Sequence, residues 1–369
     1  MLTWRELSQS ALEHNLAIIQ QYLIPNTQIC ACIKGDGYGH GLVEIAQILD
    51  QYLDWFAVFT FTEFQQLIEA GVTAHILVLG RIEDKDLEYV IRHQGRLYGY
   101  SQEYVTVIHS KAQRLGVSAF LHVPIETGMG RLGLYHKHAP EILQDWNSWP
   151  SVIIEGVVQH FATADEDEYV YYQAQQELFY QTLDQLQDLS IPYVHADNSA
   201  SIIDHGQTGY TNIVRVGASV YGFSPSEDVD ETLRENNTLL QPVLAWKTQV
   251  ISVKNLPEGH GVSYGGRKLS RNTQVAVLPI GYADGYDRRL SEKGYVLIQG
   301  QKCPILGMIC MNMTMVDVTH MEVGVGEEVV LIGMQGDRQI TVEDLAFFMD
   351  TIPYEVLTHI QTPDIIWKK

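Results

Sequence analysis

Short apolar runs alternate with longer amphipathic stretches through the first 220 residues of the chain. The runs are rich in β-branched residues and end in glycine or polar residues, which is typical of buried strands. We expect strands at 28–34, 55–60, 75–80, 96–100, 119–125, 152–159, 192–196 and 213–217. Helical periodicity lies between them at 62–70, 102–115, 140–146 and 169–189. About eight βα units predict an α/β fold of the (β/α)8 barrel type, with a doubly wound open sheet as the competing fold.

The alternation stops after Tyr221, where residues 224–242 are polar and acidic and contain prolines. This segment is the best candidate for a domain boundary. Strands are then expected at 245–253, 274–280, 295–299, 313–318 and 328–332, with little helix before 342–349. We therefore predict a barrel domain over residues 8–230 and a mostly antiparallel β domain over residues 240–369.

The composition and charge of the chain limit the binding partners that we expect. The chain has 369 residues, and its 45 acidic against 24 basic residues give a formal charge of −21. Such a surface repels nucleic acid and anionic lipid, so we expect neither as a partner. No apolar run approaches the ~20 residues that span a bilayer, and the first residues lack the features of a signal peptide, which favours the cytoplasm. The histidines and cysteines show no metal-ligand spacing, so no metal site is expected.

The first candidate for chemistry is Lys34, which follows the first predicted strand and precedes four glycines in CIKGDGYGHG. Burial at a strand end disfavours a charged ammonium group, and this suits a lysine to imine or proton chemistry. The glycines would let the backbone approach a ligand, and Tyr38 lies close by in the same loop. A surface lysine beside a flexible loop is the alternative.

Other candidates follow later strands of the predicted barrel. They are Arg131 in ETGMGRLG, His160, Asn198 and Ser199 in ADNSAS, and Arg215, Gly217 and Ala218 in RVGASVYG. Each has a structural alternative: His160 could be a core histidine, residues 165–168 an acidic first helical turn, and NSAS a helix cap. All of them fall at one end of the predicted barrel, where active sites of such barrels lie. A lysine facing phosphate-binding groups at Ser199, Gly217 and Ala218 suggests pyridoxal 5′-phosphate, bound as a Schiff base.

Eight segments then give a specific resemblance. CIKGDGYGHG, TGMGRLG, HFATADE, DNSAS, RVGASVYG, VSYGG, PIGYADGYDRRL and ICMN occur in the order found in bacterial alanine racemases, over nearly the whole chain. The resemblance implies a pyridoxal-phosphate barrel with a C-terminal β domain, against which residues 1–7 pack, and a head-to-tail homodimer. It implies the interconversion of L- and D-alanine, which supplies D-alanine for peptidoglycan.

The resemblance also implies residue roles. Lys34 resembles the lysine that carries the cofactor, and Tyr264 a second base that the partner subunit delivers to the opposite face. Arg215 resembles the arginine on the pyridine nitrogen, with His195 supporting it, and His160 the histidine that contacts the Tyr264 hydroxyl. The remaining residues resemble cofactor ligands (Tyr38, Asn198, Ser199, Gly217, Ala218, Tyr354), substrate-site residues (Arg131, Met311, Tyr282) and a neighbour of the substrate channel (Asn312).

Three departures from the family pattern leave the substrate range and rate open. Pro124 stands where many members have a lysine that becomes carbamylated and orients the arginine corresponding to Arg131. Asn312 replaces a usual aspartate, and the ending HIQTPDIIWKK lacks the usual arginine. Tyr354 favours a small substrate because it crowds the pocket. The alternatives are a broader-specificity or serine-preferring racemase, a related decarboxylase, and a pyridoxal-phosphate carrier without turnover.

Overall fold

Eight parallel strands of the first half of the chain form a nearly closed barrel, in the order β10-β2-β3-β4-β5-β6-β8-β9. They are β2 (Gln28–Cys32), β3 (Trp55–Val58), β4 (His75–Val78), β5 (Arg96–Tyr98), β6 (Ala119–Glu126), β8 (Val152–Val158), β9 (Tyr193–His195) and β10 (Ile213–Val216). Single backbone hydrogen bonds join the last two strands, from Asn212 N–H to the Val194 carbonyl (3.0 Å) and from Arg215 N–H to the Asp197 carbonyl (2.9 Å). All eight predicted strands are present, and the barrel prediction is confirmed.

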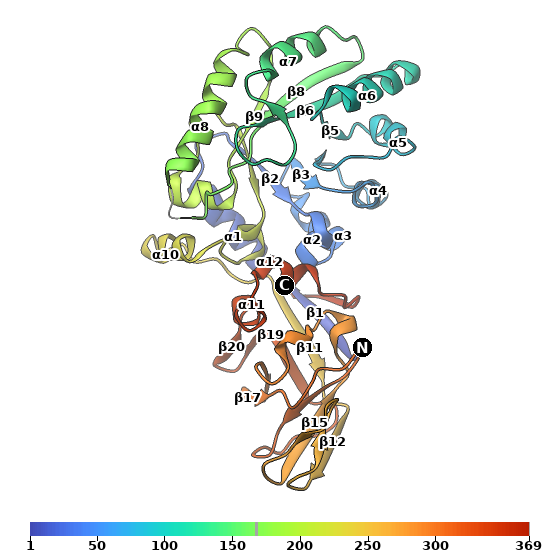
Figure 1. The fold of residues 1–369 in the computed structure, drawn as a ribbon, viewed down its shortest axis with the longest axis vertical. Helices are drawn as coiled ribbons and strands as arrows, with labels where there is room; N and C mark the ends of the chain where they lie inside the picture. Colours follow the sequence, from blue (N-terminus) through green and yellow to red (C-terminus); the bar gives the residue numbers. More distant parts are fainter. Residues whose placement is uncertain (167–168, 369) are drawn as a thin grey trace. The chain divides into compact units, whose positions relative to one another are not determined.

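Helices surround the strands of the barrel (Figure 1). They are α1 (Gln9–Gln21), α2 (Lys34–Gly39), α3 (Leu42–Leu49), α4 (Phe61–Glu69), α5 (Leu87–Arg92), α6 (Gln102–Leu115), α7 (Ala139–Asn147), α8 (Tyr169–Asp184), η1 (Ser201–His205), α9 (Ala218–Tyr221) and α10 (Glu227–Glu235), with a short strand β7 (Leu134–Tyr135). Local signals set several helix ends. Thr60 and Glu63 form a capping box at the start of α4, and α6 runs from a Ser101 cap to a left-handed Gly116.

The second half of the chain, together with the N-terminal strand β1, forms mostly antiparallel sheet. One sheet has the order β17-β16-β19-β11-β1-β21, with β20 on β19, and a second has the order β12-β15-β18. The strands are β1 (Thr3–Ser8), β11 (Leu244–Gln249), β12 (Ser252–Leu256), β13 (Gly261–Val262), β14 (Arg267–Lys268), β15 (Thr273–Leu278), β16 (Tyr295–Ile298), β17 (Gln301–Pro304), β18 (Thr314–Asp317), β19 (Glu328–Gln335), β20 (Arg338–Ile340) and β21 (Ile365–Lys368). The helices are η2 (Tyr282–Asp284), η3 (Arg288–Leu290), α11 (Val342–Met349) and α12 (Pro353–Thr358).

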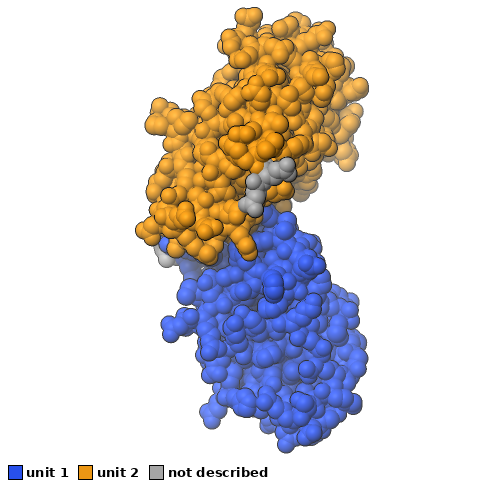
Figure 2. Space-filling model, turned by 60° about the vertical axis from the view of Figure 1, so that its left-hand side comes forward, with its two compact units in different colours: residues 1–13, 38–41, 241–369 blue, residues 14–37, 42–240 orange. Residues whose placement is uncertain are grey.

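These elements belong to two compact units of the computed structural model, which describes residues 1–166 and 169–368 (Figure 2). The barrel unit comprises His14–Gly37 and Leu42–Leu240. The β unit comprises Met1–Glu13, Tyr38–Gly41 and the chain from Gln241 onward. The domain limits expected from the sequence stay a prediction. Within the described residues, no helix has the length and apolar character needed to span a membrane.

The structure corrects one sequence prediction and adds one helix that the sequence did not predict. The strand expected at 245–253 is two strands, β11 and β12, because the chain changes sheets at Val250 and Ile251. The Val250 N–H donates to the Glu327 carbonyl beside one sheet, and the Ile251 N–H donates to the Val277 carbonyl in the other. The expected boundary at 224–242 contains the helix α10, which is acidic and buries only Val229 and Leu233. So few apolar positions give a weak helical signal.

The acidic helical turn expected at 165–168 lies partly outside the described residues, since these omit 167–168. Asp165 and Glu166 lie in a turn before α8 and not in a helix.

Candidate active site

Lys34 is half-buried at the carboxyl end of β2, where it opens the short helix α2. The five residues after it all have positive φ angles: Gly35 (64°), Asp36 (54°), Gly37 (59°), Tyr38 (52°) and Gly39 (76°). The turn is therefore left-handed, a conformation that glycine adopts freely and that costs other residues roughly 1–2 kcal/mol each. The sequence predicted a tight glycine loop here, and the structure replaces it with an ordered left-handed turn.

Two side chains hold this turn. Glu63, from the capping box of α4, accepts a hydrogen bond from the Gly35 N–H at 2.6 Å. Asp36 accepts one from the Leu42 N–H at 3.0 Å, at the start of α3. The backbone beside Lys34 is thus fixed by neighbouring helices of the barrel unit, which keeps the amine at the barrel mouth.

Gly39 is the tightest position in the turn and gives a stability prediction. A Cβ there would lie 1.9 Å from the Leu357 carbonyl oxygen, whereas a Cβ at Gly71, which has the same φ of +76°, would meet nothing within 4 Å. We expect Gly71→Ala to cost about 1 kcal/mol from backbone strain and Gly39→Ala at least about 2 kcal/mol more. Thermal unfolding midpoints of the two variants test this. Equal midpoints would show that Leu357 can move aside.

Arg215 is the most constrained cation of the barrel unit. It lies on β10 with 5% of its surface exposed. Nη1 donates to the His195 carbonyl (3.0 Å) and to His195 Nδ1 (3.1 Å). Nη2 donates to the Gln159 carbonyl (2.7 Å), the Ala196 carbonyl (3.2 Å) and His160 Nδ1 (3.2 Å). None of these acceptors is a carboxylate, and the Nε–H donates to no group among the described residues.

His160 follows β8 and lies next to Arg215. Because a guanidinium can only donate, His160 Nδ1 must accept, and the imidazole carries its proton on Nε2. Burial, followed by the charges of Arg215, Arg131 and Lys34, lowers the pKa of His160 to about 3. The ring is therefore neutral at working pH, with one N–H available as a donor.

The lowered pKa of His160 predicts a pH-dependent loss of stability. An unfolded histidine has a pKa near 6.5, so between about pH 6.5 and 3 the unfolded chain binds a proton that the folded chain does not. The contribution of this site to the free energy of unfolding is fully present above about pH 6.5. It decreases as the pH is lowered, and about 2 kcal/mol of it is lost at pH ~5. We expect the free energy of unfolding to fall less between pH ~7.5 and ~5 in His160→Gln than in the wild type. Equal falls would contradict a neutral His160 with a lowered pKa.

The expected phosphate-binding groups come together at the ends of β9 and β10. The Gly217 N–H donates to the Ser199 hydroxyl oxygen at 3.1 Å, which joins the two loops. Ala218 begins the short helix α9. Asn198 accepts from the Ser201 N–H at 3.0 Å and so caps the helical turn that begins at Ser199, ahead of η1; the helix-cap interpretation of NSAS therefore also holds.

Arg131 lies in a loop that Glu126 organises. The Glu126 carboxylate accepts hydrogen bonds from the backbone N–H groups of Gly128, Gly130 and Arg131. The charge of Arg131 contributes to the lowered pKa of His160, which places it near the barrel mouth. Sequence analysis missed Glu126, although an acid directly before a glycine-rich loop is a usable signal.

The β unit gathers a second set of predicted residues. Tyr264 lies at the tip of the β13–β14 hairpin, which the Ser263 hydroxyl ties to the Met308 carbonyl. Tyr282 N–H donates to the Cys310 carbonyl at 3.1 Å, which brings Tyr282 beside the Met311 segment. The side chains are exposed: Tyr264 by 68%, Met311 by 55% and Tyr282 by 43%, with Asn312 also exposed. Tyr38 and Tyr354, also in this unit, have ring centroids 5.8 Å apart.

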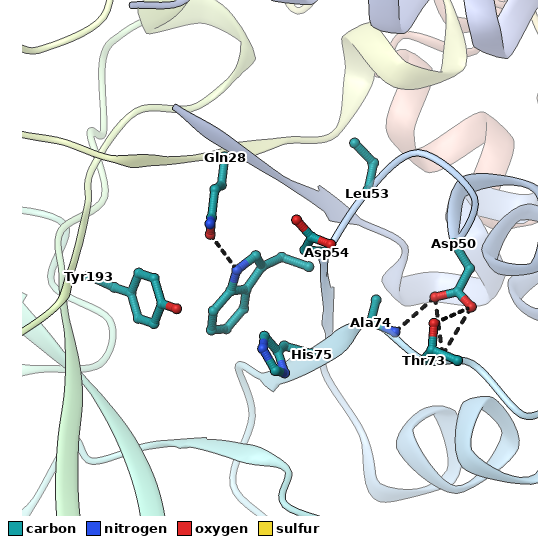
Figure 3. A pocket seen from close by; sticks show the side chains of 9 residues that line it. Gln28, Asp50, Leu53, Asp54, Thr73, Ala74, His75 and Tyr193 are labelled. Carbon is teal, nitrogen blue, oxygen red and sulfur yellow. Dashed lines mark hydrogen bonds between the residues drawn. The ribbon is translucent and has the colours of Figure 1, made fainter. Parts of the chain in front are cut away.

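A pocket of about 200 Å³ lies at the opposite, amino end of the barrel (Figure 3). Its lining includes the first residues of four strands, namely Gln28, Trp55, His75 and Tyr193. The Trp55 indole N–H donates to Gln28 Oε1 at 2.7 Å. None of the residues predicted for catalysis lines this pocket, so the predicted chemistry belongs to the other end.

Comparison with known proteins identifies the family. The alanine racemase N-terminal domain family matches residues 7–225, and the alanine racemase C-terminal domain family matches residues 243–364. The chain belongs to the alanine racemase family. An alanine racemase from Halothermothrix orenii is 39% identical over 363 residues, covering 97% of this chain and 94% of the relative. The resemblance found in the sequence is confirmed.

Solved structures of the alanine racemase family match both units. Alanine racemase from Clostridium difficile 630 has a TM-score of 0.94 and 34% identity, covering 100% of this chain and 96% of that structure. A structure named histidine racemase, from Leuconostoc mesenteroides, has a TM-score of 0.89 and 26% identity, covering 100% and 98%. The mostly antiparallel C-terminal domain is confirmed with the barrel, and the chain is an isomerase of the racemase class.

Proposed function

We propose that this alanine racemase family member interconverts L- and D-alanine with pyridoxal 5′-phosphate, using Lys34 and Tyr264 as two bases. The observation that carries the proposal is the environment of Arg215. A buried guanidinium held only by carbonyl groups and neutral histidines retains its full charge, and its Nε–H is left to donate. Such a donor suits the ring nitrogen of a pyridine in its unprotonated form.

The donor set of the barrel unit fits this cofactor. Lys34 offers an amine at the end of β2. The Ser199 hydroxyl accepts from the Gly217 N–H and keeps its own O–H to donate to a phosphate, and Ala218 at the start of α9 adds a backbone N–H. We add Asn198 of the barrel unit, and Tyr38 and Tyr354 of the β unit, to the proposed binding set. When bound, the cofactor would acidify the substrate Cα–H. An unprotonated ring is a weaker electron sink, so Arg215 limits side reactions of the substrate.

The residues then divide the proton transfer between two atoms. Racemisation removes a proton from one face of Cα and returns one to the other, so two bases on opposite sides are required. We assign one face to Lys34 Nζ and the other to Tyr264 Oη. Arg131, Met311 and Tyr282 bind and orient the substrate, and Asn312 lies beside them.

The exposure of Tyr264 supports its delivery to a partner subunit. A catalytic tyrosine that is 68% exposed at a hairpin tip requires a further surface to order it. We propose a homodimer with shared active sites, in which His160 Nε2–H donates to the Tyr264 hydroxyl oxygen of the partner. Since Arg215 fixes the tautomer of His160, the same arginine would serve both the cofactor and the second base.

Substrate choice separates alanine racemase from a broader-specificity enzyme. The aromatic contact between Tyr38 and Tyr354 favours a substrate with a small side chain. One similar structure is named histidine racemase, so a broader-specificity racemase is the alternative. Purified enzyme should racemise L-alanine with a kcat/KM at least about tenfold above that for L-serine or L-histidine. The single extra oxygen of serine in a tight pocket costs about 1–3 kcal/mol, and the imidazole ring of histidine costs at least as much. Loss of optical rotation measures each rate. A preference for serine or histidine would overturn the alanine assignment.

Two predictions concern the cellular setting. The role in supplying D-alanine for peptidoglycan follows from the proposed reaction. The cytoplasmic location expected from the sequence stays a prediction.

A further inference from the structure

A line of hydrogen bonds runs from Arg215 through the interior of the barrel. His195 Nε2 lies 2.8 Å from His122 Nδ1, and His122 Nε2 lies 3.2 Å from Glu155 Oε2. Glu155 in turn accepts two hydrogen bonds from Arg96, from Nε at 2.9 Å and from Nη2 at 3.2 Å. With the 3.1 Å bond from Arg215 to His195 Nδ1, five side chains on β10, β9, β6, β8 and β5 form one chain of contacts.

The chemistry of its ends fixes every proton in this line. Arg215 can only donate, so His195 Nδ1 accepts and His195 carries its proton on Nε2. His122 Nδ1 must then accept from His195, which leaves the proton of His122 on Nε2, where it donates to the Glu155 carboxylate. A second proton on either ring would place two N–H groups face to face. Both histidines are therefore neutral, in agreement with burial lowering the pKa of each.

The surroundings leave the histidines little room to rearrange. His122 and His195 are buried, and the rings of Trp55 and Tyr193 pack on His122 with centroids at 5.4 and 6.1 Å. A Cβ on Gly156 would lie 2.3 Å from His122 Nδ1, so that glycine is needed for His122 to occupy its place. Arg96 binds both oxygens of Glu155 and holds the carboxylate at the far end.

We propose that His122 and Glu155 are positioning residues for Arg215. Glu155 fixes the tautomer of His122, His122 fixes that of His195, and His195 then presents a lone pair that orients the Arg215 guanidinium. The N–H groups of this line all point toward Glu155. Because hydrogen bonds in a chain strengthen one another, the negative charge of Glu155 makes His195 Nδ1 a better acceptor for Arg215. The inference deepens the proposed function, since it explains how the arginine assigned to the cofactor ring is held.

Neutron diffraction from crystals of the deuterated holoenzyme tests the proton positions without reference to activity. The expected result is one deuteron on Nε2 of both His122 and His195 and none on either Nδ1. A deuteron on Nδ1 of either ring, or two on one ring, would overturn the proposal. Either outcome is independent of whether the enzyme racemises alanine, so it can fail while the proposed function holds.

Kinetics of Glu155→Gln test the functional consequence. A glutamine has one accepting oxygen and one NH2 donor, so it cannot accept from Arg96 at two atoms and from His122 as well. The tautomers of the two histidines then become mixed. We expect kcat for alanine to fall about 10- to 100-fold with KM changed less than about threefold. Glu88→Gln is the matched control, because Glu88 also pairs with an arginine, Arg114, but lies outside the line; it should keep wild-type kinetics. A wild-type kcat in Glu155→Gln would contradict the positioning role. If that variant fails to fold, the neutron experiment on the wild-type protein still tests the proposal.

Discussion

Replacing Lys34 with alanine is expected to abolish racemisation, with kcat/KM falling by at least about 10⁴-fold. Lys34 is assigned both the covalent attachment of the cofactor and proton transfer on one face, and no other lysine is assigned to the site. Loss of optical rotation of L-alanine measures the rate. Borohydride treatment followed by peptide mapping should mark Lys34 in the wild type and nothing in the variant.

Lys85→Ala is the control for Lys34, because Lys85 is an exposed lysine whose ion-pair partner is Glu83. It should retain wild-type activity and cofactor content. A Lys34→Ala protein that racemises alanine at more than about a hundredth of the wild-type rate would show that another group carries the cofactor.

Replacing Tyr264 with phenylalanine removes one hydroxyl from the proposed second base, and kcat should fall about 10²- to 10⁴-fold. The variant should keep its cofactor, because Tyr264 belongs to the β unit and the proposed amine and ring contacts belong to the barrel unit. Lys34 remains, so exchange of the Cα proton with deuterated solvent should continue for one alanine enantiomer and stop for the other.

Tyr282→Phe is the matched control for Tyr264, since Tyr282 is another exposed tyrosine of the β unit. Its expected effect is less than about tenfold and lies mainly in KM, because a residue that only contacts substrate contributes to binding. If Tyr264→Phe exchanged the proton of both enantiomers at equal rates, a one-base mechanism on Lys34 would replace the two-base proposal.

Much of the fold follows from sequence periodicity because the buried strands are short apolar runs of aliphatic and aromatic residues, bounded by glycine or polar residues. Two features do not. The left-handed turn after Lys34 includes Asp36 and Tyr38, residues that avoid positive φ in isolation, and Glu63 and α3 supply the missing stabilisation. The break between β11 and β12 occurs inside a stretch with no glycine or proline to mark it, because the choice of sheet depends on distant partners at Glu327 and Val277.

The candidate site, like the fold, is only partly predictable from the sequence. The order of strands predicted that His160, Ser199 and Arg215 meet at one end of the barrel, and in the structure Arg215 contacts His160 while Gly217, two residues after Arg215, contacts Ser199. Nothing local in the sequence marks His122 or Glu155, because each is one residue within a strand and the two are joined only by the closed barrel. Their role depends on hydrogen-bond direction, which requires coordinates.

The central claim is that each active site combines Lys34 of one subunit with Tyr264 of another. Co-expression of Lys34→Ala and Tyr264→Phe, each inactive alone, tests it directly. In a mixed dimer one of the two sites would receive both intact residues, so random pairing predicts about a quarter of wild-type activity. If the two residues act within one chain, every site in the mixed dimer lacks one of them, and activity no greater than that of the separate variants would contradict the account.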